Sequence, residues 1–304
     1  MTATANAITK GTTFSPDLVK SVFSKVKGHS TLAALSQSEA IPFVGKDIVT
    51  LSMDGEVSIV AESGAKPEGA AGKDKVTIVP IKVVYQKRFS DEFLHCSEEK
   101  QLDYMEKFSD GVAKKCARGL DIMAFHGVDP ASKQASELIG TNCFDSKITG
   151  SSVISYTSGT DAPDAKIDAA IAAVEDAEYA CNGIAMAPSM RSDIADMRTQ
   201  DGARVYPDFA FGGTPASLGA SKLDVNPTVS FNSSDMRAVV GDFENAFVWG
   251  MCEDIDFEVI EYGDPDGQGT DLKNRNQVCF RAEAYIAWGI MDTAAFASVE
   301  APSA

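Results

Sequence analysis

Residues 46–127 constrain the fold most, because an alternating strand in this stretch runs straight into a very long helix. The segment KVTIVPIKVVYQKRF (75–89) has the period-2 pattern that predicts a β-strand. Lys82 and Gln86 lie on one face of that strand, and apolar residues share the other: Val79, Ile81, Val83, Tyr85 and Phe89. Pro80 cannot donate a ladder hydrogen bond, so we expect an edge strand or an exposed ribbon.

The segment SGAKPEGAAGKDK (63–75) is typical of a hairpin tip. It has three glycines, one proline and three lysines, and no side chain large and apolar enough to pack on a core. Such a hairpin needs a partner outside its own subunit. We therefore expect the tip, centred on Gly64, Lys66, Pro67 and Glu68, to gain protection from hydrogen exchange only on assembly.

One uninterrupted helix is predicted from residue 98 to residue 126. Ser97 precedes it as a candidate N-cap, and Gly127 ends it. Apolar residues recur at three- and four-residue steps and form one stripe: Leu102, Met105, Phe108 or Ser109, Val112, Cys116, Leu120 and Met123. At 1.5 Å per residue this helix would be roughly 43 Å long, well beyond the average globular helix. A rod of that length is suited to a flat, extended subunit.

Charge and length exclude several classes of protein. The chain has 304 residues, 27 of them basic and 44 acidic, with a net charge of −17. Because phosphate contacts require clustered Lys and Arg, this balance argues against a sequence-reading nucleic-acid protein. No apolar run approaches the ~18 residues of a membrane span, and the first residues lack the pattern of a signal peptide. We therefore expect a protein that has no membrane partner and stays in the cytoplasm.

Motifs for common catalytic chemistry are missing from the sequence. It contains no phosphate-binding P-loop, no Gly-x-Ser-x-Gly elbow and no His-Glu-x-x-His helix. The six cysteines are too widely spaced for a Cys-x-x-Cys pair, so we expect reduced thiols and no cofactor. We expect structural roles for the three histidines, which are His29, His95 and His126.

An acidic loop, GDPDGQGTDLKN (263–274), is predicted between two strands that alternate around residues 255–259 and 278–288. It offers oxygen atoms at alternate positions, as a calcium loop does. It lacks the combination of a glycine at the sixth position and a bidentate glutamate at the twelfth. An acidic turn is therefore favoured over a metal site.

In the order and spacing of its segments, the chain resembles the major capsid proteins of tailed bacteriophages, which have the Hong Kong-type capsid fold. The segments that carry the resemblance are AESGAKPEG (61–69) for the E-loop tip, KRFSDEFL (87–94) and LDIMAFHG (120–127) for the two ends of the spine helix, AMAPSMRSDIADMRTQDGARVY (185–206) for the axial domain, and VVGDFENAFVWG (239–250) with NQVCFRAEAYIAWGIMDTAAFASV (276–299) for the closing strands. It covers about residues 10 to 300.

The resemblance implies an α+β subunit with five parts. These are an N-terminal arm (1–45), an extended E-loop hairpin (46–89), a peripheral domain with the spine helix (90–150), an axial domain (151–250), and the closing strands and loop of the peripheral domain (251–304). It implies no catalytic, cofactor or metal residues. It implies assembly contacts at the E-loop tip, and in the peripheral loop at Asp264, Asp266, Asp271 and Lys273.

Some members of this family join an E-loop lysine to a neighbour's asparagine with the help of a buried glutamate. Glu283 stands at the glutamate position and Lys66 is the candidate donor, but Asp271 stands where the asparagine would be. A carboxylate is a much poorer acceptor than an amide. A solvated charge or an ion pair is therefore the favoured role of Lys66.

The function that follows is a structural protein, not an enzyme, which self-assembles into hexamers and pentamers of an icosahedral shell around phage double-stranded DNA. Its location would be the virion capsid, assembled in the host cytoplasm. Its partners would be other copies of itself, and portal, scaffold or decoration proteins, with DNA contacted without sequence specificity. A net charge of −17 suits an inner wall that repels phosphate, although it equally serves solubility. Two alternatives remain: a nanocompartment shell of the same fold around protein cargo, and a soluble metal-dependent hydrolase that uses the acidic loop.

Overall fold

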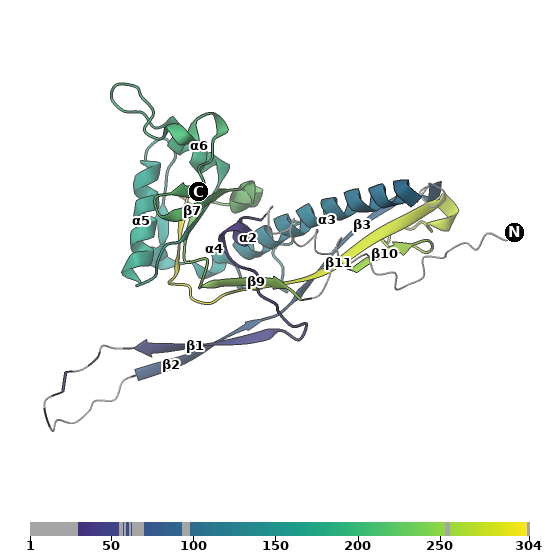
Figure 1. Cartoon of the computed structure of the whole chain (residues 1–304), viewed down its shortest axis with the longest axis horizontal. Helices are drawn as coiled ribbons and strands as arrows, with labels where there is room; N and C mark the ends of the chain where they lie inside the picture. The colour runs from purple at the N-terminus through teal and green to yellow at the C-terminus, as the bar shows by residue number, and fades with distance from the viewer. Residues whose placement is uncertain are drawn as a thin grey trace.

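The computed structural model describes residues 30–54, 57, 59–60, 62, 70–92, 98–252 and 256–302. The chain is extended: a narrow hairpin, a long helix lying along a sheet, and a second sheet set at one end of that helix (Figure 1). The short helix α2 (Thr31–Leu35) packs where the long helix meets the second sheet. The E-loop tip residues 63–69 lie outside the described residues.

The hairpin is formed by β1 (Lys46–Asp54) and β2 (Ala70–Ile78), which pair antiparallel from Lys46 opposite Ile78 to Asp54 opposite Ala70. These two strands form a sheet of their own and project away from the rest of the chain (Figure 1). An isolated two-stranded hairpin is marginally stable at best. The hairpin is therefore held to its own subunit only at its base.

The expected single strand over 75–89 was wrong. The chain leaves β2 after Ile78 and begins β3 at Ile81, running to Ser90. Between them Pro80 has no amide hydrogen to donate, so the ladder breaks there. β2 pairs with β1, whereas β3 pairs with a strand nearly 200 residues later in the sequence. The strand β2 begins at Ala70, so the second half of the segment expected at the tip, residues 70–75, is part of a strand.

The spine helix α3 extends from Glu98 to His126, as predicted. Its stripe is buried at Val112, Leu120 and Met123, each no more than 3% exposed. It lies along a four-stranded antiparallel sheet in which β11 (Gln277–Ile290) pairs with β3, β10 (Asp256–Ile260) and β9 (Phe247–Met251). The ring of Phe108 packs against Tyr85, Phe89 and Phe280, so apolar residues of the β3 face contact the helix.

A six-stranded sheet forms the second layer, in the order β4-β12-β8-β5-β7-β6. Its strands are β4 (Val153–Ser155), β5 (Gly183–Met186), β6 (Ser217–Leu218), β7 (Ser221–Val225), β8 (Met236–Gly241) and β12 (Phe296–Glu300). Helices α5 (Pro163–Asp176) and α6 (Pro188–Asp196) pack on one face. The helices α2, α3 and α4 (Phe144–Lys147) contribute to the core on the other. Alternate residues of each strand serve the two cores, as Ile184 and Ala185 do.

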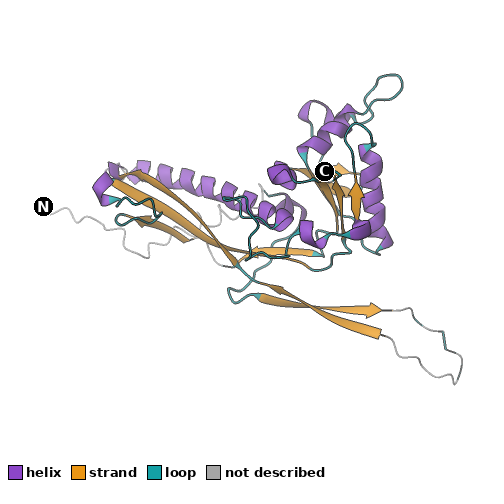
Figure 2. Ribbon diagram, turned by 180° about the vertical axis from the view of Figure 1, so that it is seen from behind, coloured by secondary structure: helices purple, strands orange, loops and turns teal. Residues whose placement is uncertain are grey.

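Short 3-10 turns complete the connections: η2 (Gly150–Ser152), η3 (Pro207–Gly212), η4 (Pro227–Ser233) and η5 (Lys273–Arg275). Figure 2 shows the helices on the two sides of the upright sheet and the bare hairpin below. Helix α5 ends at Asp176, and Glu178 then takes a left-handed conformation at φ 65° where the chain turns toward β5. Cys181 is therefore not part of that helix.

Two strands are paired differently from the expected domain boundaries. β12 lies at the C-terminal end of the sequence but pairs with β4 and β8 of the six-stranded sheet. β9 (Phe247–Met251) lies almost entirely before the expected boundary at residue 250 but pairs with β11 of the four-stranded sheet. The two sheets thus exchange one strand each, which links them through the covalent chain as well as through the shared core.

Candidate assembly site

The peripheral loop (263–274) connects β10 to β11, as the alternating patterns predicted. Asp271 closes it: one carboxylate oxygen accepts the Gly263 amide at 3.0 Å, and the other accepts the Lys273 amide at 2.8 Å. The Leu272 amide donates to the Gly263 carbonyl at 2.9 Å, and the Leu272 side chain is fully buried beneath the turn. Asp271 therefore shapes the loop through two backbone hydrogen bonds.

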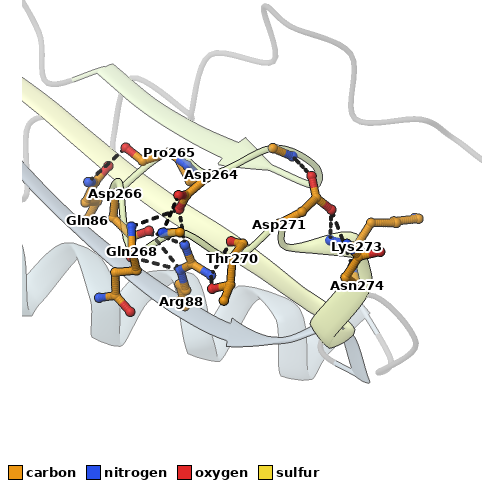
Figure 3. A network of polar contacts seen from close by, with 12 residues as sticks. Gln86, Arg88, Asp264, Pro265, Asp266, Gln268, Thr270, Asp271, Lys273 and Asn274 are labelled. Atoms are coloured by element: carbon orange, nitrogen blue, oxygen red, sulfur yellow. Dashed lines mark hydrogen bonds and ion pairs between the residues drawn. The ribbon is translucent and has the colours of Figure 1, made fainter.

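Arg88 of β3 holds the first half of the loop (Figure 3). Its Nε donates to both carboxylate oxygens of Asp266, at 2.8 and 3.0 Å, and a terminal nitrogen donates to Asp264 at 2.6 Å. The remaining nitrogen donates to the Thr270 carbonyl and hydroxyl, both at 3.0 Å. One guanidinium thus joins three positions of the loop, using the planar fork that suits arginine to carboxylates.

Burial and charge make this network stronger than an ordinary surface pair. The Arg88 side chain is 11% exposed and that of Asp266 is 16% exposed. The hydrogen bond from Arg88 holds the pKa of Asp266 below its usual value, and the same bond raises the pKa of Arg88. Asp264 additionally accepts the amides of Gln268 and Gly269 at 3.1 and 2.6 Å. These carboxylates are already coordinated by protein donors, which is the arrangement of a structural turn.

A second contact, also visible in Figure 3, fixes the base of the loop. The amide of Gln86 donates to the Pro265 carbonyl at 3.3 Å, and Arg281 of β11 donates to both Pro265 and Gln86. Gln86 and Arg88 are alternate residues of β3, so both lie on the polar face that the sequence assigned to Gln86. The loop is therefore ordered before any neighbour arrives.

The four predicted loop residues are only partly brought together. Asp264 and Asp266 meet at Arg88, Asp271 serves its own turn, and the Lys273 side chain is exposed at the far end of the loop. The sequence analysis missed Arg88 as the organising residue. An arginine on the polar face of a strand was a visible signal, but the acids opposite it are nearly 180 residues away in the sequence. It also missed Tyr262, which is 76% exposed beside the loop.

The E-loop tip residues Gly64, Lys66, Pro67 and Glu68 lie outside the described residues, but the hairpin that leads to them is described. Its base is buried through Ile78 against Ile41 and Ala287. Only glycine fits at position 289, because a Cβ there would lie 2.8 Å from Ile78. Next to this anchor the surface turns apolar and exposed, at Phe43, Val44 and Val79.

Glu283 forms an ion pair with Lys82 at 2.6 Å across the β3–β11 ladder. The candidate cross-linking glutamate therefore already has a cation partner within its own subunit. The bond to Glu283 raises the pKa of Lys82, which keeps the amine charged. This ion pair joins two strands of the sheet, and the candidate donor Lys66 lies outside the described residues.

A buried carboxylate joins the spine helix to the segments packed on it. Asp121 accepts the Ser30 hydroxyl, the Thr31 and Leu32 amides at 3.0 and 3.2 Å, and the Thr228 hydroxyl at 3.0 Å. It thereby caps α2, whose first amides would otherwise lack partners. Burial raises the pKa of Asp121 to about 6, although the four donors oppose this effect.

His126 at the end of the same helix has a structural role, as the sequence analysis expected. Its Nδ1 lies 2.8 Å from the Asp145 carboxylate and its Nε2 lies 2.9 Å from the Thr228 carbonyl. Both neighbours are acceptors, and the side chain is 4% exposed. Asp121 and His126 together hold the turn that contains Thr228 against the C-terminal half of α3.

Comparisons with known proteins agree with this architecture. The model of the phage capsid family matches residues 10–301. A solved chain from Mycobacterium phage Ogopogo is 32% identical with a TM-score of 0.76, covering 90% of this chain and 92% of that one. A chain from Gordonia phage Cozz is 25% identical with a TM-score of 0.74, covering 91% and 87%. A search of curated protein sequences gives no match.

A more distant structure shares the fold alone. It is described as the capsid of a native GTA particle computed with C5 symmetry, is 17% identical, and covers 90% of each chain with a TM-score of 0.63. Within the described residues, no helix is both long enough and apolar enough to cross a membrane. With the family model matching nearly the whole chain, the protein belongs to the phage capsid family and has its Hong Kong-type fold.

Proposed function

We propose that copies of this structural capsid protein form the hexamers and pentamers of an icosahedral head shell around phage double-stranded DNA. The observation that carries the proposal is the hairpin of β1 and β2. In the described part of the chain it pairs only with itself, and it leaves apolar side chains such as Val49 and Val79 exposed. A ribbon of this kind gains stability when a neighbouring subunit covers it.

Within one subunit the described strands of the hairpin, β1 and β2, lead away from the peripheral loop. The peripheral loop lies at one end of the long axis and the hairpin points away at the other (Figure 1). Contacts between the E-loop tip and the loop residues Asp264, Asp266, Asp271 or Lys273 would therefore form between copies. We propose the same five-part division as the sequence analysis, with β12 assigned to the axial sheet and β9 to the peripheral sheet.

Packaged DNA would be contained without sequence-specific binding. The net charge of −17 implies weak and salt-sensitive contact, and the burial that holds a shell together would come from contacts between subunits. Portal, scaffold and decoration proteins are further proposed partners, with assembly in the host cytoplasm.

Negative-stain microscopy of the purified chain, combined with analysis of the particle contents, tests this proposal. We expect closed shells in the presence of the phage packaging components, with duplex DNA inside, and shells that persist after nuclease treatment. Protein cargo without nucleic acid would instead indicate a nanocompartment. A small monodisperse species with hydrolytic activity lost on chelation would contradict a shell protein altogether.

A further inference from the structure

The outer face of the spine helix carries a line of cations. Lys100, Lys107, Lys114 and Arg118 are all exposed, and steps of seven, seven and four residues return to nearly the same side of an α-helix. The line extends over roughly 27 Å at 1.5 Å per residue. Between Lys107 and Lys114 lies Gly111, where an added Cβ would meet nothing within 4 Å. The face is therefore open along this line.

The charge on this face is concentrated in the C-terminal half of the helix. On this face residues 111–120 contribute Lys114 and Arg118 and no acidic residue, in a chain whose net charge is −17; the third basic residue, Lys115, lies about 100° farther round the helix. Lys107 pairs with Asp103 at 2.8 Å, but among the described residues no carboxylate lies within ion-pair distance of Lys114 or Arg118. The guanidinium of Arg118 lies 5.4 Å from the ring of Phe231, which positions it without neutralising it.

A straight row of exposed cations matches an extended polyanion better than a small ligand. Lysine and arginine side chains on a surface bind phosphate oxygens without reading base sequence. On this basis, and resting on the proposed function, we propose that the outer face of α3 contacts the phosphate backbone of the packaged duplex through Lys100, Lys107, Lys114 and Arg118. The inner wall of the shell would then be acidic overall but carry one basic line in each subunit.

The double variant Lys114→Gln/Arg118→Gln tests this contact in the full-length chain. The matched control is Lys133→Gln/Arg275→Gln, which removes the same charge from exposed positions elsewhere. Fluorescence anisotropy with a short DNA duplex gives the affinity at a series of salt concentrations. Removing two phosphate contacts should reduce the slope of log affinity against log salt by about 2. The control should keep the wild-type slope.

Three outcomes would overturn the inference: no salt-dependent binding by the wild-type chain, an unchanged slope in the double variant, or an equal loss in the control. Thermal melting of each variant confirms that folding is intact. Microscopy of the same preparations separates this result from the proposed function. If all proteins form shells, an unchanged slope removes the inference alone. If the double variant binds DNA normally but fails to assemble, the basic line contacts another copy of the chain instead.

Discussion

The hairpin and the peripheral loop are both exposed connections at opposite ends of the molecule, but the protein holds them in different ways (Figure 1). The loop is pinned by a nearly buried arginine that bonds three of its positions. The hairpin has a buried anchor at its base and, farther out, the exposed ion pair of Lys75 and Asp47. The loop is thus ordered by its own subunit, whereas for the hairpin we propose that a neighbouring copy covers it.

The anchor of the hairpin gives the largest expected effect. Ile78→Asp places a charge at a fully buried position and should destabilise the fold by about 4 kcal/mol or more. Val79→Asp is the matched control one residue later, where the side chain is 63% exposed. Its stability should change by less than ~0.5 kcal/mol, while shell yield falls. Denaturant unfolding and particle counting measure both; equal destabilisation by the two variants would show that the anchor is misplaced.

The buried carboxylate of Asp121 in the spine helix should make the unfolding free energy of the whole fold depend on pH. The pKa of Asp121 is raised to about 6 in the folded state, so its protonated form is favoured there. This stabilisation is complete below pH ~4 and is lost as pH rises through about 6, a change on the order of 3 kcal/mol. Asp121→Asn should flatten this part of the profile of unfolding free energy against pH. Asp129→Asn should leave this part of the profile in place, because the hydrogen bond from the Ser132 side chain holds the pKa of Asp129 below its usual value.

Replacing Arg88, which bonds three positions of the peripheral loop, should have a local effect. In Arg88→Ala the amides of Gln268 and Gly269 should exchange faster, because the carboxylate of Asp264 that accepts them loses its cation. The amides of β1 and β2 should exchange as before. The folded state lowers the pKa of Asp266. The stabilisation from the Arg88–Asp266 pair is therefore complete above the usual carboxyl pKa and is lost as pH falls through the lowered pKa. Uniform loss of protection across the molecule would contradict a local role.

The smallest effect is expected at the ion pair of the hairpin. Both Lys75 and Asp47 are more than half exposed, so Lys75→Ala should leave melting unchanged within error. High salt should likewise leave the loop amides protected, because the Arg88 network is much less exposed to screening. Melting and exchange at two salt concentrations test this point. A large loss of stability on Lys75→Ala would mean that the two regions are held alike.

Local patterns predicted the elements best. The spine helix over 98–126 follows from its unbroken three- and four-residue periodicity, and β10 and β11 with their acidic loop follow from strict alternation. These signals are local, because a helix or strand that buries one face has apolar residues at a regular spacing within its own short segment. The order and spacing of the segments along the chain were also enough to recognise the resemblance to the capsid family, which the family model confirms.

What only the tertiary structure decided is which partner each segment has. Pro80 indicated an edge strand or an exposed ribbon, but the break between β2 and β3 and the pairing of β3 with β11 depend on a ladder between residues nearly 200 apart. The clustering of Arg88 with Asp264 and Asp266 depends on the register of that same ladder. The sequence by itself determined the elements and the family, because periodicity and order are local or linear properties. Pairing, strand exchange and the pinned loop required the fold, because a period-2 pattern gives the face of a strand but not its neighbour.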